Sequence, residues 1–149
     1  MLPTLDSARD EILGLFNVKW AADTPAINEG VAIPIEWQGV DSGSPPDPNA
    51  PFCRVTVNHA TGQQSTFGAV GERRFTRSGV VTVQIFAPLS AGGGLSFAVK
   101  AAIIARNAYE GIGTDSGIWF RNARIQEIGP SETWHQINVV TDFFYDELR

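Results

Sequence analysis

Cysteine and histidine are scarce in this chain of 149 residues, which has one cysteine and two histidines. The lone Cys53 cannot form an intramolecular disulfide, and without any CxxC pair there is no zinc site of ordinary spacing. We therefore expect a protein that needs no metal or other cofactor and that suits a reducing cytosol.

Long apolar runs and an excess of positive charge are also missing. No segment approaches the ~20 apolar residues of a membrane span, and the first residues lack the basic start and apolar run of an export signal. Eleven Lys and Arg face sixteen Asp and Glu, for a formal net charge of -5. We expect a protein that is made without export and has no membrane partner, and whose contacts with DNA are at most local.

The sequence lacks the common motifs of catalysis and nucleotide binding. Its glycines form neither GxGxxG nor the phosphate-loop pattern GxxxxGK, and its carboxylates follow no calcium-loop or paired-carboxylate spacing. Cys53 shares one face of an alternating segment with Val55 and Val57, which predicts a buried, inert thiol. His59 and His135 could be neighbours in space, but no acid is placed to orient them, and we interpret them as surface or edge histidines. The chain is therefore predicted not to be an enzyme.

The composition is that of a packed protein, with 43% hydrophobic and 18% charged residues. At this length, one domain over residues 1–149 is expected. Apolar residues recur at helical spacing over residues 4–22, where Thr4 can cap the start, and again over residues 97–109, where the helix should end near Gly111. The second stripe is rich in alanine, which suits close packing on a sheet.

Six segments show the alternation or residue types of strands. They are residues 31–37, 52–57, 63–67, 73–86, 118–128 and 135–145. Pro34 marks the first as an edge or bulged strand, Thr61-Gly62 predicts a hairpin turn between the second and third, and Gly129-Pro130-Ser131 lies in the link before the last. Residues 39–51 hold four prolines and are predicted to be a long exposed loop. The predicted class is α+β, with a mostly antiparallel β-sheet flanked by two α-helices in a single domain.

One charged cluster is conspicuous, in the segment Gly71-Glu-Arg-Arg-Phe-Thr-Arg77. Two interpretations of Arg73, Arg74, Phe75 and Arg77 are open. These residues are either a solvated strand entrance or a contact to an acidic patch on a neighbouring subunit or partner. A basic ring lining that faces DNA is a further alternative.

Aromatic residues are numerous for a chain of this size, and they include Trp37, Trp119, Phe120 and Trp134. The run Phe143-Phe144-Tyr145 places aromatic rings on both faces of the last strand. Core packing is the first explanation, and a strand covered by another subunit is the second.

Two long stretches resemble a known family. The run from Phe52-Cys-Arg-Val through Gly71-Glu-Arg-Arg-Phe-Thr-Arg-Ser-Gly-Val-Val-Thr-Val-Gln-Ile-Phe-Ala-Pro88 is similar to the tail terminator-like proteins of siphophages. The later segments Gly117-Ile-Trp-Phe-Arg-Asn-Ala-Arg-Ile-Gln-Glu-Ile-Gly129 and Trp134-His-Gln-Ile-Asn-Val-Val-Thr-Asp-Phe-Phe-Tyr-Asp-Glu147 extend the resemblance to nearly the whole chain.

This resemblance implies a structural virion protein. It would cap the head-proximal end of the phage tail tube as a homohexameric ring, end tube polymerisation and offer a surface to the head-tail connector. Its partners would be itself, the tube protein and the connector, with DNA only passing through the ring. The protein would be made in the host cytoplasm and reside in the virion tail. A closed ring needs two different patches per subunit, and Arg73, Arg74 and Arg77 are our candidates for one of them.

Three alternatives remain open at this stage. Another ring protein of the virion, such as a connector or tube subunit, could share this size and sheet content. A thiol enzyme would use Cys53 with a histidine, and a nucleic-acid-binding module would use the arginine cluster with Phe75.

Overall fold

Helix α1 (Leu5–Asp23) opens the fold, as its apolar spacing predicts. The computed structural model describes residues 2–40, 43, 47–89, 94–131 and 133–149. Thr4 and Ser7 form a capping box, in which the Ser7 backbone N–H donates to the Thr4 hydroxyl and the Thr4 N–H donates to the Ser7 hydroxyl. The buried stripe consists of Ala8, Ile12, Phe16 and Trp20, each one turn from the next.

The turn after α1 explains why the first strand is shorter than predicted. A 3-10 turn (Thr24–Ala26) follows the helix, and strand β1 is only Ile35–Trp37 rather than residues 31–37. The backbone N–H of Ile33 donates to the buried Thr24 hydroxyl (3.1 Å), and its carbonyl accepts the Trp20 indole N–H (2.9 Å). Because these side chains use the backbone of Ile33 and Pro34 has no N–H, pairing starts only at Ile35. The edge position of this strand is confirmed.

Strand β2 (Phe52–Gln64) and strand β3 (Arg74–Pro88) form a long antiparallel hairpin. The predicted turn at Thr61-Gly62 is wrong, because these residues lie within β2 and pair with β3 just after an irregularity between His59 and Thr61. Pairing along β3 overrides the local turn signal, so the predicted strand 52–57 continues to Gln64. Residues 65–67, predicted as strand, lie in the loop that follows. β3 is buried on the face that carries Val81, Val83 and Ile85.

Helix α2 (Gly94–Asn107) and strands β4 (Trp119–Ser131) and β5 (Trp134–Leu148) complete the chain. The last two strands pair antiparallel as predicted, but Gly129-Pro130-Ser131 belongs to β4 rather than to the link between the strands. The sheet order is β1-β2-β3-β5-β4, in which only β1 and β2 run parallel. The structure thus confirms the α+β class with a mostly antiparallel sheet.

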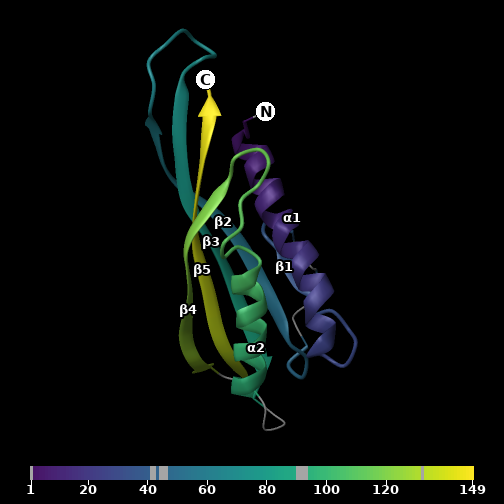
Figure 1. Cartoon of the computed structure of the whole chain (residues 1–149). Helices are drawn as coiled ribbons and strands as arrows, with labels where there is room; N and C mark the ends of the chain where they lie inside the picture. Colours follow the sequence, from purple (N-terminus) through teal and green to yellow (C-terminus); the bar gives the residue numbers. More distant parts are fainter. Residues whose placement is uncertain (1, 41–42, 44–46, 90–93, 132) are drawn as a thin grey trace.

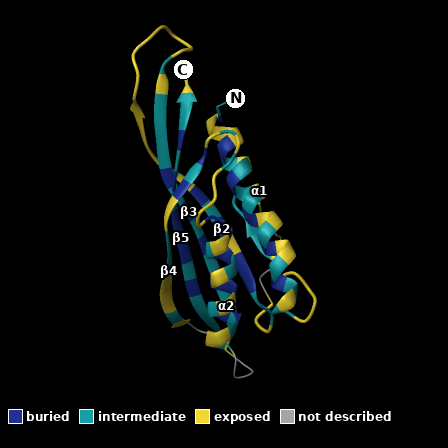
Figure 2. Ribbon diagram, viewed as in Figure 1, coloured by how far each residue is buried: buried dark blue, intermediate teal, exposed yellow. Residues whose placement is uncertain are grey.

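Both helices cover the same face of the sheet (Figure 1). One core forms between them, lined by the alanines of α2, the buried stripe of α1 and the inward side chains of the strands. The other face has no helix over it, and its centre is half-buried rather than fully buried (Figure 2). The β2–β3 hairpin extends past the N-terminal end of α1 (Figure 1).

Two further sequence predictions concern loops and membranes. The loop predicted at residues 39–51 lies partly outside the described residues, and its described part contains no strand or helix. Across the described ranges, the two helices are too short or too polar to cross a bilayer.

Candidate interaction surfaces

The predicted arginine cluster is divided between the two faces of the sheet. β3 residues with odd numbers face the helices, so Phe75 and Arg77 share the inner face with Tyr145, while Arg74 lies on the outer face. Arg74 pairs with Asp146 at 3.6 Å and remains half-exposed. Arg73 precedes the strand and donates from Nε to the backbone oxygen of Arg149 (3.3 Å). The three guanidinium groups therefore do not form one patch.

Arg77 is held by its own chain. Its Nη2 lies 2.9 Å from Glu147 Oε1 and its Nε 3.1 Å from the same oxygen, and the two side chains are 22% and 14% exposed. The guanidinium also lies over the Phe75 ring, 5.2 Å from its centroid. A Cβ at Gly62 would collide with this guanidinium, so a glycine there gives Arg77 room to lie across β2. Of the three arginines, Arg77 is therefore the least free to reach a partner.

We expect Arg77→Ala to lower the free energy of unfolding by about 1 to 2 kcal/mol, because it leaves the mostly buried Glu147 carboxylate without its partner. Urea unfolding followed by circular dichroism would measure the loss. Arg121→Ala is the matched control, because Arg121 is exposed and forms no ion pair with the described residues. Equal stability of the two variants would contradict a structural role for Arg77.

His59 lies beside this cluster on the inner face. Its Nε2 is 2.7 Å from the Tyr145 hydroxyl, and its Nδ1 is buried without a hydrogen-bond partner among the described residues. Burial lowers the pKa of His59, and the positive charges of Arg9 and Arg77 lower it further. Burial and the nearby Glu147 raise the pKa of Tyr145. His59 is therefore held in its neutral form, as a packed element of the fold.

The lowered pKa of His59 predicts a dependence of stability on pH. The unfolded chain binds a proton at this residue more readily than the folded chain, so its stabilising effect is complete above about pH 6.5 and is lost as the pH falls through the folded pKa. Arg9, Arg77, Glu147 and Tyr145 surround the ring and would persist in a His59→Gln variant. We expect the urea midpoint of the wild type to fall more steeply below pH 6.5 than that of His59→Gln. Parallel curves would contradict this assignment.

The two histidines considered for catalysis are not brought together. His59 pairs with Gly79 in the middle of the sheet, whereas His135 pairs with Ala87 and Pro130 near its other end. Eight residues of strand β3 separate those pairs, which at about 3.3 Å per residue is a distance of roughly 26 Å. The possibility that the two histidines are neighbours is therefore wrong.

Cys53 is a core residue, as predicted. It is fully buried, and burial, with a smaller effect of Glu36, raises the pKa of its thiol far above the ordinary value. A thiol held in the protonated form inside the core is a poor nucleophile and a poor metal ligand. Within the part of the chain that the structure describes, no three His, Cys, Asp or Glu side chains gather in a group that could hold a metal ion.

The uncovered face of the sheet carries two aromatic groups. Phe52 stacks on Phe86 at 4.7 Å and meets Trp134 edge-on, and the Arg54 guanidinium lies within 5.5 Å of both phenylalanine rings. Trp119 stacks on Phe144 at 5.9 Å. The predicted two-sided aromatic character of β5 is therefore present, since Phe143 and Tyr145 are in the core and Phe144 lies on the open face.

The tip of the β2–β3 hairpin is the most exposed apolar feature of the described chain. Phe67 is 98% exposed and Val70 is 86% exposed, and no described residue covers them. The loop is nevertheless tied at its base, because the Arg74 N–H donates to the Thr66 hydroxyl (2.8 Å) and the Ser65 N–H donates to the Arg74 carbonyl (2.8 Å). The result is a fixed projection with an apolar end.

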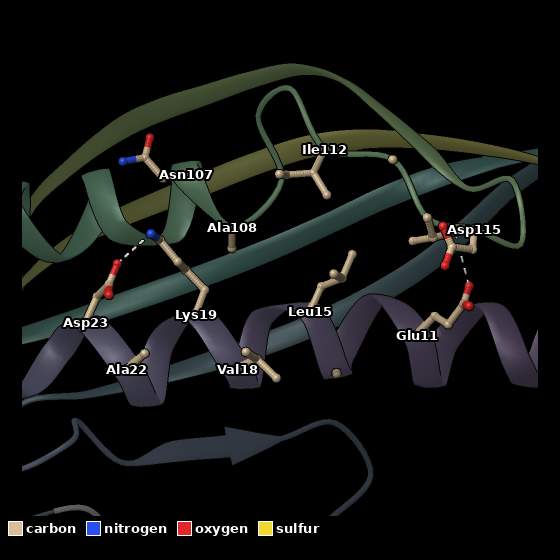
Figure 3. Close-up of a pocket in the computed structure, with 13 residues that line it drawn as sticks. Glu11, Leu15, Val18, Lys19, Ala22, Asp23, Asn107, Ala108, Ile112 and Asp115 are labelled. Atoms are coloured by element: carbon tan, nitrogen blue, oxygen red, sulfur yellow. Dashed lines mark hydrogen bonds and ion pairs between the residues drawn. The ribbon is translucent and has the colours of Figure 1, made fainter.

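A groove of about 890 Å³ opens between α1 and the segment that follows α2. Figure 3 shows its floor and walls, which include Leu15 and Val18 of α1 and Ile112 opposite. Lys19 pairs with Asp23 at 2.6 Å at one end of the groove. At the other end Glu11 accepts hydrogen bonds from the hydroxyls of Ser116 (2.5 Å) and Thr114 (3.4 Å), which tie the segment to α1.

Sequence reasoning missed both the hairpin tip and the groove. Val70 stands between Gly68 and Gly71, and Phe67 directly precedes Gly68, which was the available signal of apolar side chains in a turn; the prediction of a strand at 63–67 hid it. The sequence contains no such signal for the groove. Its two walls are about ninety residues apart in the sequence, and the packing of α2 on the sheet brings them together.

Comparison with known proteins supports the fold. No family model matches the sequence, and no curated protein matches it significantly. One solved structure aligns over 95% of this chain and 97% of the other chain, with a TM-score of 0.60 and 17% sequence identity. At this identity the likeness shows the arrangement of helices and strands alone.

Proposed function

We propose that this protein is a tail terminator-like subunit of a long-tailed bacteriophage. Six copies would form a ring on the head-proximal end of the tail tube, stop its polymerisation and present a surface to the head-tail connector. The number six, the position on the tube and the connector as partner come from the resemblance of residues 52–88, 117–129 and 134–147 to that family. The proposed role is structural rather than enzymatic, and the proposed location is the virion tail.

One observation carries the assembly part of this proposal. The hairpin that contains the first resembling stretch projects beyond the helices and ends in two apolar side chains that no described residue covers. Two large apolar side chains that stand almost fully exposed at the end of a projecting hairpin form a surface that another chain can cover. The half-covered aromatic groups of the open sheet face fit the same interpretation.

Only part of the arginine cluster remains a candidate for contact with a partner. Arg74 is 49% exposed despite its ion pair with Asp146, and Arg73 lies beside the projecting loop, so these two are our candidates for a polar contact to a neighbouring subunit. Phe75 and Arg77 would support that contact from the inner face. Charge reversal should therefore begin with Arg73→Glu, which leaves the Arg77–Glu147 pair intact.

The test of the function is a phage in which the gene for this protein carries a stop codon. Electron microscopy of the lysate measures tail length and head attachment. The proposal predicts overlong tails without heads, and purified protein added during assembly should restore the normal length. Tails of normal length that lack heads would indicate a connector, and an absence of tails would indicate a tube subunit. Either result would overturn the terminator assignment.

The ring itself is tested on the purified protein. Sedimentation over a wide concentration range, with negative-stain imaging of the same samples, should reveal six-subunit rings with an open centre. DNA binding at low salt that falls steeply as salt rises would instead favour the nucleic-acid-binding module.

A further inference from the structure

We infer that the β2–β3 hairpin tip of one copy seats in the α1 groove of a second copy. The hairpin tip is the loop of residues 65–73, and the α1 groove is the cavity lined by Leu15, Val18 and Ile112. The inference rests on the proposed ring, because it names the two surfaces that would form its subunit contact. It also specifies a head-to-tail contact, in which one copy contributes the tip and the other the groove.

The two surfaces match in chemistry. The tip presents Phe67 and Val70 with nothing over them, and the groove exposes Val18 to 73% and Ile112 to 39% between its walls. A groove of about 890 Å³ has the capacity of a site that encloses a drug-sized molecule, and two apolar side chains from a turn fall within it. Burying each surface with the other removes apolar area from water on both sides.

The two surfaces also match in charge. Glu11, Asp23 and Asp115 line the groove against one lysine, Lys19. The hairpin tip carries Glu72 and Arg73, and next to it Arg74 pairs with Asp146 of β5 while its guanidinium stays half-exposed. Asp115 is exposed and forms no ion pair among the described residues, so a guanidinium from another chain can reach it. The guanidinium groups of Arg73 and Arg74 are thus cations that a groove with a net negative lining can attract.

The tip cannot fill the groove of its own chain. The hairpin extends past the N-terminal end of α1, as Figure 1 shows, whereas the groove runs along α1 from Glu11 to Asp23. The tip is also anchored by strand pairing down to its base, where Gln64 pairs with Phe75 and Arg74 with Leu148. A tip and a groove at different places on one molecule make a contact that repeats from copy to copy, and it closes into a ring when the rotation allows.

The experiment uses three single-site variants of the full chain. Phe67→Asp disables the tip, Val18→Asp disables the groove, and Val40→Asp is the control, because Val40 is 66% exposed but belongs to neither surface. All three side chains are exposed, so circular dichroism should show an unchanged fold for each variant. Sedimentation over a wide concentration range measures self-association of each variant alone and of tip and groove variants mixed in equal amounts.

We expect Phe67→Asp and Val18→Asp each to raise the dissociation constant for self-association at least about thirtyfold, and Val40→Asp to match the wild type. The mixture should form dimers and nothing larger, because one intact groove meets one intact tip and both remaining surfaces are disabled. A mixture that assembles to dimers and no further is expected only if the tip of one copy binds the groove of another.

Three outcomes would overturn the inference. They are wild-type association by either disabled variant, a mixture that stays monomeric, and a wild type that remains monomeric at every concentration. None of these decides the proposed function, which depends on tail length in the stop-codon phage. Rings that persist in both variants would show that a different surface, such as the free edge of the sheet, joins the copies.

Discussion

Replacing Trp20 with alanine should lower the free energy of unfolding by about 4 kcal/mol, the largest effect we expect from a single truncation in this protein. The ring is 1% exposed and stacks on Phe16 at 5.0 Å, so its removal leaves a large cavity in the core. The indole N–H also donates to the Ile33 carbonyl (2.9 Å), and the variant leaves that buried acceptor without this donor. For a domain whose total stability is about 5 to 15 kcal/mol, this is a large fraction.

Urea unfolding monitored by circular dichroism measures the effect, since loss of a tryptophan complicates fluorescence. Val18→Ala is the control on the same helix, because Val18 is 73% exposed and its truncation should change stability by less than about 0.5 kcal/mol. Trp20→Phe should cost less than Trp20→Ala, because it keeps most of the packing while losing the hydrogen bond and part of the buried ring. If all three variants were equally stable, the placement of Trp20 at the centre of the core would be wrong.

Gly79→Ala should destabilise the fold by about 3 kcal/mol although it adds only one methyl group. A Cβ at this position would collide with the backbone oxygen of Asn58 and would lie 2.6 Å from Cζ of Phe143 and 2.9 Å from Cα of His59. The Asn58 oxygen belongs to the neighbouring strand, and the Phe143 ring is fully buried, so neither can move aside without disturbing the sheet or the core.

Gly14→Ala provides the opposite result in the same protein. Gly14 lies on the exposed side of α1, and a Cβ there would meet nothing within 4 Å, so alanine should stabilise the helix by about 1 kcal/mol. Thermal unfolding of both variants beside the wild type compares them directly. A Gly79→Ala protein as stable as the wild type would mean that β2, β3 and β5 are not packed as tightly as described.

The helices and the class of the fold were predictable because local pattern decides them. Ala8, Ile12, Phe16 and Trp20 recur once per turn after a capping threonine, and the alanines of α2 do the same. The alternation of Val81, Val83 and Ile85 within the predicted strand 73–86 likewise coincides with the buried face of β3. In each case the apolar residues whose spacing indicates the element are also the ones that pack into the core, so local propensity and tertiary packing agree.

The strand boundaries were less predictable because distant partners set them. Thr61-Gly62 has the composition of a turn, but β3 supplies a pairing partner to the residues on both sides, and Gly62 serves to admit the Arg77 side chain. β1 is short because Trp20 and Thr24, which come from the preceding helix and turn, use the backbone groups of Ile33. Neither constraint is visible within the segment it shapes.

The candidate surfaces were harder to predict than the strand boundaries, because they depend on tertiary structure. The sequence predicted one cluster of Arg73, Arg74, Phe75 and Arg77. Strand alternation instead places Arg74 and Arg77 on opposite faces of the sheet. Arg77 forms an ion pair with Glu147, which is seventy residues away in the sequence. The hairpin tip is a candidate surface because the fold leaves Phe67 and Val70 exposed, which the sequence does not reveal. Local sequence indicated which residues were charged or apolar, and the fold determined which of them a partner can reach.

The position of β5 in the sheet has a consequence for synthesis on the ribosome. β5 lies between β3 and β4 in the sheet order, although it is the last element of the chain. Until its residues emerge, β3 has an unpaired edge on that side and β4 lacks its partner strand in the sheet, so the nascent chain exposes strand edges that can pair wrongly. The core is therefore completed only after the fifteen residues of β5 have left the ribosome.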